Sequence, residues 1–319
     1  MRIFKAAAWI AVIAAVVIVV NCVLDHILVP NQYARVKVHE IETETYQDLI
    51  LGTSHGASAF DPSVMTEITG RTTYNAAMGG EYLRDSLYML KDAVASGHAP
   101  ERVIYECDPT YFCIDNDMSE NESYLFSVVR PSLVKAEYYF DVMWAEDFRW
   151  SFFRWSYYLD YADRIGETVA EKASDDYKNY GVSCFAGETQ ALHEDGFNAI
   201  FDDSPAGTTI PKTYTAEDEL LDENLDELRE LAGYCAAQGI ELIVVTTPIP
   251  AETAAGSETF FNYANDEISA LCAELGVSYL NYNFIESGLD RSIEAYSDLE
   301  GHMRESAAAA FSALFASEL

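Results

Sequence analysis

The sequence has few basic side chains. Its 319 residues include 19 lysines and arginines against 53 aspartates and glutamates, which gives a formal charge of −34 at pH 7. A surface with this charge repels phosphate backbones, so we expect no nucleic-acid partner. The acidity is equally compatible with a salty or acidic habitat, and by itself it assigns no activity.

Cysteine and histidine are also scarce, with six residues of each. The cysteine spacing matches no metal site, and we expect neither a metal nor a cofactor. Cys107 and Cys113 are close enough in the sequence to bridge a loop. The six histidines leave little choice for a catalytic base, which makes the position of each one informative.

Long uncharged runs are rare, and the one long enough to cross a bilayer covers residues 6–24, AAAWIAVIAAVVIVVNCVL, where Asn21 is the polar exception. Arg2 and Lys5 precede it. Basic residues favour the cytoplasmic side, so residues 1–5 are expected in the cytoplasm and the rest outside it. The sequence therefore predicts a single-pass protein of the cell membrane with an extracytoplasmic domain.

A cleaved signal peptide is the main alternative for this run. It needs a shorter apolar core and small residues at the cleavage site, whereas valine, asparagine, cysteine and leucine precede Asp25. A lipoprotein anchored at Cys22 is a weaker third interpretation, because Asn21 is larger than the residue that normally precedes a lipidated cysteine. We favour an uncleaved anchor.

Beyond the anchor, residues 25–45 mix charges without lasting periodicity and are expected to form a stalk. Residues 46–319 then alternate short aliphatic runs with helical apolar stripes, which is typical of an α/β domain with a doubly wound parallel sheet. The expected strands cover residues 49–51, 72–77, 102–107, 240–247 and 277–282. The expected helices cover residues 81–97, 221–238 and 304–319, and a further helix runs through Ile268, Leu271 and Leu275.

An insertion at residues 114–216 interrupts this alternation. It contains the aromatic run YYFDVMWAEDFRWSFFRWSYYLDY, followed by polar and glycine-rich sequence. Insertions of this kind in doubly wound folds often form a cap beside the site. Packing of a helical subdomain is the commoner use of such aromatics, and a sugar-stacking platform is the alternative.

The stretch LILGTSHG, residues 49–56, predicts a buried strand that ends in a tight turn carrying Ser54. Ligands of parallel sheets bind beyond the carboxyl ends of the strands, so Ser54 is a candidate nucleophile. A serine hydroxyl needs a base, and His302 lies in the loop before the last helix, four residues after Asp298. This carboxylate is suited to orient the imidazole.

The other histidines are weaker candidates for the base. His39 lies in the expected stalk, His98 lies beside a helix end, and His193 lies in the insertion. His55 is adjacent to Ser54 and points another way in a turn, so we place it outside the triad, lining the pocket or bonding neighbouring backbone. On spacing alone, Asp298 and His302 are more often a surface pair beside a helix start, but a serine at a strand tip favours the catalytic interpretation.

Three motifs, LILGTSHG, TYNAAMGG and YSDLEGHM, resemble those of the SGNH or GDSL serine hydrolase superfamily. The likeness covers roughly residues 46–113 and 217–319, and it is greatest to membrane-anchored bacterial members similar to the alginate O-acetylation proteins and the D-alanine transfer protein of teichoic acid synthesis. The resemblance implies a flavodoxin-like fold with Ser54 as nucleophile, His302 as base and Asp298 as its orienter. It also implies an oxyanion hole formed by the N–H groups of Ser54 and Gly80.

Two departures from the family pattern leave alternatives open. The family usually places two residues between its aspartate and histidine, whereas three separate Asp298 from His302, so the loop must bulge or Glu300 must act instead. An oxyanion-hole asparagine is missing after the third strand, where Asp108 stands. Asn75 is an alternative donor that otherwise braces the turn.

The sequence therefore predicts an extracytoplasmic serine esterase or O-acyltransferase acting on an acylated glycan or other cell-envelope polymer through an acyl-enzyme. A membrane-bound acyl donor protein is expected as a partner if the enzyme is a transferase. The alternative is a catalytically degenerate module of the same fold that binds a surface glycan or scaffolds an envelope assembly.

Overall fold

The computed structural model describes residues 2–114, 120–208 and 211–319. The chain divides into two compact units, the first formed by Met1–Val36 and Met118–Cys184 and the second by Lys37–Asp117 and Phe185–Leu319. The expected insertion at 114–216 is thus shared between the two units.

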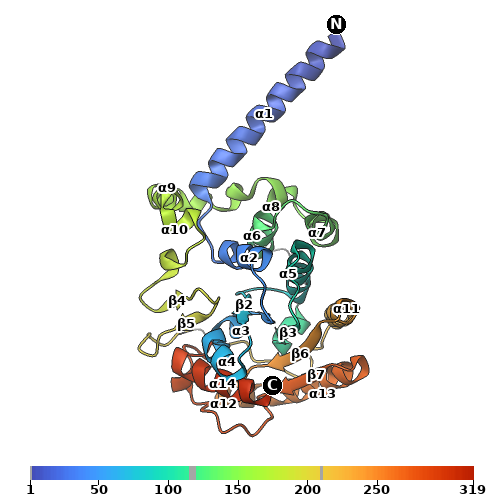
Figure 1. Ribbon diagram of the computed structural model, residues 1–319, viewed down its shortest axis with the longest axis vertical. Helices are drawn as coiled ribbons and strands as arrows, with labels where there is room; N and C mark the ends of the chain where they lie inside the picture. Colours follow the sequence, from blue (N-terminus) through green and yellow to red (C-terminus); the bar gives the residue numbers. More distant parts are fainter. Residues whose placement is uncertain (1, 115–119, 209–210) are drawn as a thin grey trace. The chain divides into compact units, whose positions relative to one another are not determined.

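The first unit is helical and begins with the long apolar helix α1, Arg2–Leu28 (Figure 1). Its part Phe4–Leu28 is long and apolar enough to span a membrane, which agrees with the predicted anchor. The remaining helices of this unit are α6 (Glu120–Val128), α7 (Leu133–Tyr138), η2 (Tyr139–Met143), α8 (Phe148–Phe152), η3 (Arg154–Tyr157), η4 (Leu159–Arg164), α9 (Ile165–Ala173) and α10 (Asp175–Lys178).

The second unit is built on a five-stranded sheet in the order β2-β1-β3-β6-β7, and all of its neighbouring strands run parallel. The strands are β1 (Asp48–Leu51), β2 (Thr73–Asn75), β3 (Arg102–Glu106), β6 (Glu241–Thr246) and β7 (Ser278–Asn281). Each predicted strand is present. The order is that of flavodoxin-like folds, so the predicted fold class is confirmed.

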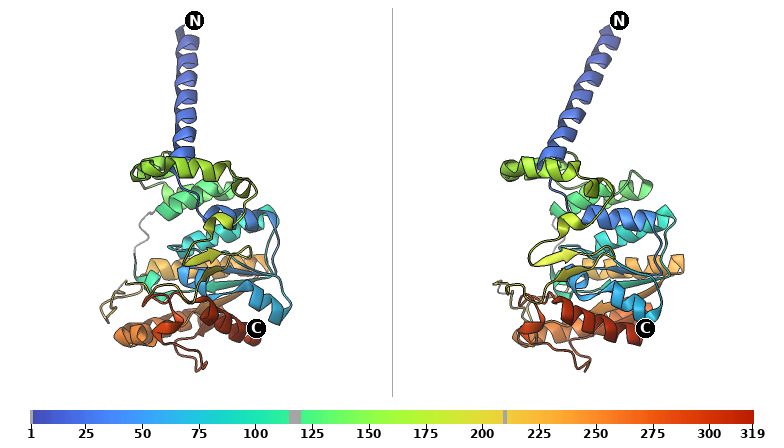
Figure 2. Two further views of the ribbon diagram at one scale, coloured as in Figure 1. Left: turned by 90° about the vertical axis from the view of Figure 1, so that its left-hand side faces the viewer. Right: turned by 60° about the vertical axis from the view of Figure 1, so that its left-hand side comes forward.

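Helices cover both faces of this sheet (Figures 1 and 2). The helices α3 (Ser54–Ala59), α4 (Pro62–Thr69) and α14 (Glu305–Glu318) pack together on one face. On the other face lie α5 (Leu83–Ser96), α11 (Asp222–Gln238) and α13 (Glu258–Leu275). This double cover explains the apolar run Leu49–Leu51 of β1, because a strand buried on both sides has no solvent face to make polar.

The core on the α14 face is rich in aromatic rings. Phe60, Phe311, Phe315 and Tyr282 are fully buried and contact one another with ring centroids 5.0–6.3 Å apart. These contacts pack α14, which carries Phe311 and Phe315, against Phe60 at the end of α3. The two ends of the second unit's sequence are thereby brought to one side of the sheet, where a shared site becomes possible.

Some expected connections turn out differently. The expected stalk contains the helix α2, Ala34–Thr43, and its side chains Lys37, Val38 and Ile41 are buried, so this segment is packed and not free. The last part of the insertion forms a two-stranded hairpin, β4 (Gln190–Leu192) and β5 (Asn198–Ile200), within the second unit. Cys107 and Cys113, which are close enough in the sequence to bridge a loop, are both free thiols.

Candidate active site

Ser54 stands in a sharp turn at the carboxyl end of β1. Gly52 has a φ of +132°, and a Cβ there would lie 2.5 Å from the Glu106 carbonyl oxygen, so only glycine fits this position. Thr53 then caps α3 by accepting a hydrogen bond from the His55 N–H at 3.2 Å. Ser54 is the first residue of the helix, so its backbone N–H has no partner within the helix.

His302 and Asp298 lie on a loop held in shape before α14. The ends of the loop pair through a bridge between Tyr296 and Met303, and the Ser297 N–H donates to the His302 carbonyl at 2.8 Å. Asp298 Oδ1 accepts hydrogen bonds from the N–H groups of Glu300, Gly301 and His302 at 3.0, 3.0 and 3.3 Å. The backbone therefore wraps around one carboxylate oxygen and leaves the other for the imidazole.

Gly301 makes room for the extra residue between the aspartate and the histidine. Its φ is +124°, and a Cβ there would lie 2.8 Å from Ile249 Cγ2. A residue with a side chain would be strained by both its backbone conformation and this contact. The bulge expected from the spacing is thus present, and it keeps Asp298 as the partner of His302.

The three predicted side chains meet. His302 Nε2 lies 2.8 Å from Ser54 Oγ, and His302 Nδ1 lies 2.7 Å from Asp298 Oδ2. The histidine and aspartate side chains are 20% and 16% exposed, so water has limited access to the pair. With a proton on Nδ1, the neutral ring presents a lone pair at Nε2 to the serine hydroxyl, which is the arrangement of a nucleophile and its base.

The charges around the pair favour an ionised aspartate and a basic histidine. Partial burial opposes ionisation of Asp298, but the hydrogen bond and charge of His302 and two backbone N–H groups outweigh it and lower the pKa of Asp298 well below its usual value. Burial also opposes protonation of His302. The hydrogen bond and charge of Asp298, with the charges of Glu300 and Asp108, outweigh that burial and raise the pKa of His302 above 6.5.

The oxyanion-hole predictions have mixed outcomes. Asn75 is fully buried, and its Nδ2 donates to the carbonyls of Gly56 and Phe60 at 2.9 Å each, while its Oδ1 accepts from the Ala77 N–H at 3.1 Å. Its amide is used by the backbone, so the predicted role as an oxyanion donor is wrong and its alternative role as a brace holds.

Gly80 lies in the loop between β2 and α5, with a φ of +70°. The start of this loop is held beside the nucleophile turn, because the Met78 N–H donates to the Gly52 carbonyl at 3.0 Å. The assignment of the Gly80 N–H to the oxyanion hole, together with the Ser54 N–H, stays a prediction.

Two acidic residues at the carboxyl end of β3 support the site, Glu106 as the last residue of the strand and Asp108 just after it, and the sequence interpretation gave them no role. Glu106 is fully buried and accepts hydrogen bonds from the N–H and hydroxyl of Thr53 at 3.0 and 2.7 Å. Burial, with the nearby charge of Asp108, raises the pKa of Glu106 to about 8. Asp108 Oδ2 lies 3.3 Å from His55 Nδ1. The signal was present, since both residues lie at the carboxyl end of a strand that pairs directly with β1.

His55 forms a second histidine–aspartate pair beside the first. Its ring meets that of His302 edge-on, with centroids 4.9 Å apart. Burial lowers the pKa of His55 and outweighs the opposing charge of Asp108, while the neighbouring His302 lowers it further. A neutral His55 therefore lies against the catalytic pair without adding a positive charge to it.

The remaining histidines lie elsewhere. His98 Nδ1 bonds the Thr45 hydroxyl at 2.8 Å, and the ring of His193 packs against Phe197 in the hairpin. Asp298, Glu300 and His302 each offer one metal-ligand atom within 4.8 Å of the others. Both ring nitrogens of His302 already have protein partners, Asp298 and Ser54, so His302 and Asp298 are better described as members of the triad.

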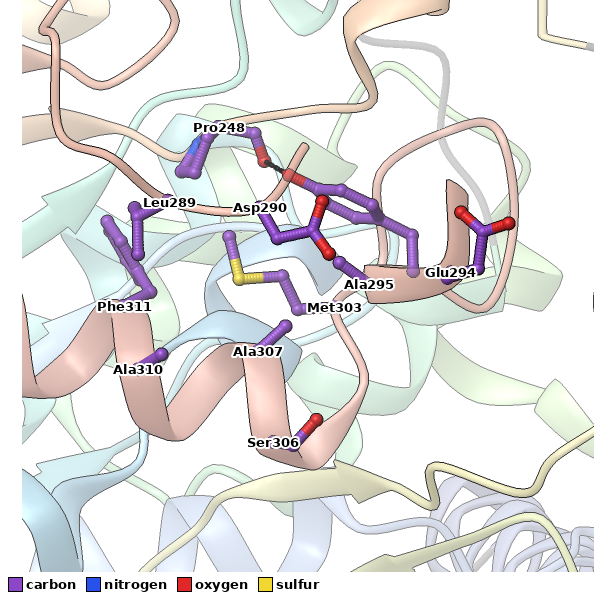
Figure 3. A pocket seen from close by; sticks show the side chains of 11 residues that line it. Pro248, Leu289, Asp290, Glu294, Ala295, Met303, Ser306, Ala307, Ala310 and Phe311 are labelled. Atoms are coloured by element: carbon purple, nitrogen blue, oxygen red, sulfur yellow. Dashed lines mark hydrogen bonds between the residues drawn. The ribbon is translucent and has the colours of Figure 1, made fainter. Parts of the chain in front are cut away.

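A separate cavity of about 250 Å³ lies beside Tyr296 and Met303, the two ends of the loop that carries Asp298 and His302 (Figure 3). Figure 3 shows Ala307, Ala310 and Phe311 of α14 on one side of it and Leu289 and Met303 close by. The lining is Pro248, Leu289, Asp290, Glu294, Ala295, Tyr296, Met303, Ser306, Ala307, Ala310 and Phe311. It contains none of the three triad residues, so it is distinct from the place where Ser54 would meet an acyl group.

Comparisons with known proteins add little to this geometry. No family model matches the sequence, and neither does any curated protein. Among solved structures, a Bacteroides fragilis protein described as a "putative acylhydrolase" is similar at 10% identity, with 90% of this chain and 93% of that chain covered and a TM-score of 0.41. A similarity at this level assigns no activity to the chain.

Proposed function

We propose that this protein is a serine esterase or O-acyltransferase that works through an acyl-enzyme at Ser54. One observation carries the proposal: a serine at a strand tip, a histidine and an aspartate lie in a continuous chain of contacts of 2.8 and 2.7 Å. The family resemblance of the motifs supports membership of the SGNH superfamily. Its membrane-anchored members suggest an acylated envelope polymer as the substrate.

The chemistry follows from the positions of the three side chains. Ser54 Oγ attacks the acyl carbonyl while His302 Nε2 takes its proton, and the imidazolium then gives this proton to the departing alcohol. Asp298 stabilises the imidazolium and holds the ring in the tautomer that leaves Nε2 free. Water, or a sugar hydroxyl in a transferase, then attacks the acyl-enzyme, losing its proton to His302, and Ser54 is regenerated.

The transition state also needs hydrogen bonds to its oxyanion. We assign these to the backbone N–H groups of Ser54 and Gly80, because the Asn75 amide is already bonded and an ionised Asp108 has no proton to donate. A hole with two donors is expected to give slower turnover than one with three, since removing one donor typically costs about 10²–10³-fold in rate.

An oxyanion hole with only two donors also favours a second candidate function, a catalytically inactive module that binds a glycan or scaffolds an assembly. A fluorophosphonate probe distinguishes the two, because it reacts with activated serines. The full chain in detergent should be labelled at Ser54, as located by peptide mass analysis. Labelling should be lost in Ser54→Ala and strongly reduced in His302→Ala. An unlabelled wild-type chain that is folded would refute the enzyme and leave the binding module.

A further inference from the structure

The first unit carries large apolar side chains on its surface. We define the aromatic patch as Leu133, Phe140, Trp144, Phe148 and Phe152, whose exposed fractions range from 52% to 84%. They come from α7, η2, α8 and the turn between them. Soluble surfaces rarely gather so many exposed large apolar side chains, and such a patch usually marks a contact surface.

Three members of the patch are linked by ring contacts. The rings of Phe140 and Trp144 have centroids 5.6 Å apart, and Tyr139 contacts both of them and Phe152 at 5.2–6.0 Å. The backbone beneath it is helical, so these rings are held on a defined surface and not on a loose loop.

The unit that carries the patch is fixed to the end of α1. The indole Nε1 of Trp155 donates to Asn21 Oδ1 at 2.8 Å, and its backbone N–H donates to Asp25 Oδ1 at 3.2 Å. Lys172 Nζ donates to the carbonyls of His26 at 3.0 Å and Val29 at 2.5 Å, which occupies carbonyls left open at the end of α1. In Figure 2 the helices of this unit gather around that end of α1.

These contacts place the unit at the depth of a membrane surface. A bilayer core of about 30 Å takes about 20 helical residues, so a span that starts at Phe4 ends near Val23. Asn21 therefore lies at the edge of the core, and Trp155, bonded to it, lies in the headgroup region. Tryptophan and tyrosine favour this region. Three of the four tryptophans, Trp144, Trp150 and Trp155, occur within residues 128–164.

The charge of the same stretch differs from that of the whole chain. Residues 128–164 contain five basic and six acidic side chains, whereas the full sequence has a charge of −34. The acidic excess that would repel an anionic membrane is thus nearly absent here. Near-neutral charge together with exposed rings suits a headgroup layer better than bulk water.

We propose that the aromatic patch lies in the interfacial layer of the bilayer that α1 crosses, so that the first unit rests on the membrane. The proposal requires α1 to be inserted and is independent of catalysis at Ser54. A second copy of the chain and another membrane protein are the competing occupants of the patch.

Photocrosslinking tests which of these occupies the patch. The full chain with benzoylphenylalanine in place of Phe140 is reconstituted in vesicles of phosphatidylcholine and phosphatidylglycerol and irradiated. We expect lipid adducts at position 140. The matched control places the same probe at Tyr263, which is 37% exposed on α13 of the second unit, and should give few adducts. Crosslinks to a second chain, no adduct, or equal yields at the two positions would overturn the proposal.

Fluorescence gives a second test with a milder substitution. The emission of Trp144 is obtained as the difference between the wild-type chain and Trp144→Tyr, both reconstituted in vesicles. Lipids brominated near the headgroup end of their acyl chains should quench most of this difference, whereas unbrominated lipids should not. A Trp144 emission that is the same in both lipids would show that the ring lies outside the membrane and would contradict the proposal.

Discussion

Ser54 and His302 are 248 residues apart in the sequence and 2.8 Å apart in the fold. If they act as a unit, Ser54→Ala and His302→Ala should each reduce turnover of an acyl ester by about 10⁴-fold or more. The double variant should be little slower than either single one, because a serine without its base is already inactive. Steady-state kinetics on an activated ester measures this. Additive losses would show that the two residues act separately.

Asp298 orients the base and stabilises its charge, so Asp298→Ala should cost less, about 10²–10⁴-fold. Glu300→Ala is the matched control. Glu300 is also an acidic residue of this loop, but the carboxylate bonded to His302 Nδ1 is that of Asp298. We expect the control to retain most activity. The reverse order of effects would identify Glu300 as the orienting carboxylate.

The raised pKa of His302 predicts the acid limb of the pH profile. A general base must be neutral, so kcat/KM should fall as the pH drops through the pKa of His302, which lies above 6.5. Asp298→Asn removes the charge and the acceptor that raise this pKa, and should move the limb to lower pH while reducing the rate. Glu300→Gln should move it in the same direction by less. An unmoved limb in Asp298→Asn would assign it to another group.

Glu106 predicts a pH dependence of stability. The pKa of Glu106 is about 8 in the folded chain, against an ordinary value of 4.5 in the unfolded chain. Between these two pH values the folded chain keeps a proton that the unfolded chain has lost. Stability should therefore fall as pH rises across this window. The side chain in Glu106→Gln cannot titrate and can still accept hydrogen bonds from Thr53. Wild type should therefore lose stability from pH 5 to pH 8 while the variant does not. The difference in free energy of unfolding, variant minus wild type, should increase over this range in urea denaturation. A constant difference would contradict the raised pKa.

Arg304 connects two elements that carry the site. Its guanidinium donates to the carbonyls of Tyr296 at 2.9 Å, Phe201 at 3.0 Å and Ser204 at 2.9 Å, so it ties the histidine loop to the segment after β5. Lysine cannot reproduce this fork. Arg304→Lys should lower stability by about 1–3 kcal/mol, because buried carbonyls lose their donors, and should slow turnover by loosening the loop.

The matched control for Arg304→Lys is Arg229→Lys. Arg229 forms an ion pair with Asp226 on an exposed helix face, and such pairs contribute about 0–1 kcal/mol. Thermal unfolding and ester kinetics of the two variants provide the comparison. Equal effects would mean that Arg304 is not the connection between the two elements.

At the scale of the whole molecule, the prediction concerns membrane topology. Residues 6–24 should remain attached, with residues from 25 onward outside the cytoplasm, because Arg2 and Lys5 favour the inner side. Protease added to intact cells should digest the domain and leave a cytoplasmic marker protein untouched. Full protection of the domain until the cells are opened would reverse the orientation.

The sequence by itself determined the elements and most of the candidate site. Aliphatic runs such as Leu49–Leu51 and apolar helical stripes depend on neighbours close in the chain, so their periodicity revealed the strands and helices. Ser54 was identified because it directly follows such a strand, and His302 and Asp298 because they share the loop before the last helix. The apolar helix α1 was evident because length and composition alone decide whether a helix can span a membrane.

Only the tertiary structure decided which polar groups are free and which are used. Asn75 lost its predicted role because its amide meets the carbonyls of Gly56 and Phe60 once α3 folds back, and no local pattern reveals that contact. The support from Glu106 and Asp108 depends on the pairing of β1 with β3, across more than fifty residues. Hydrogen bonds and burial depend on distances in space, which a linear sequence does not contain.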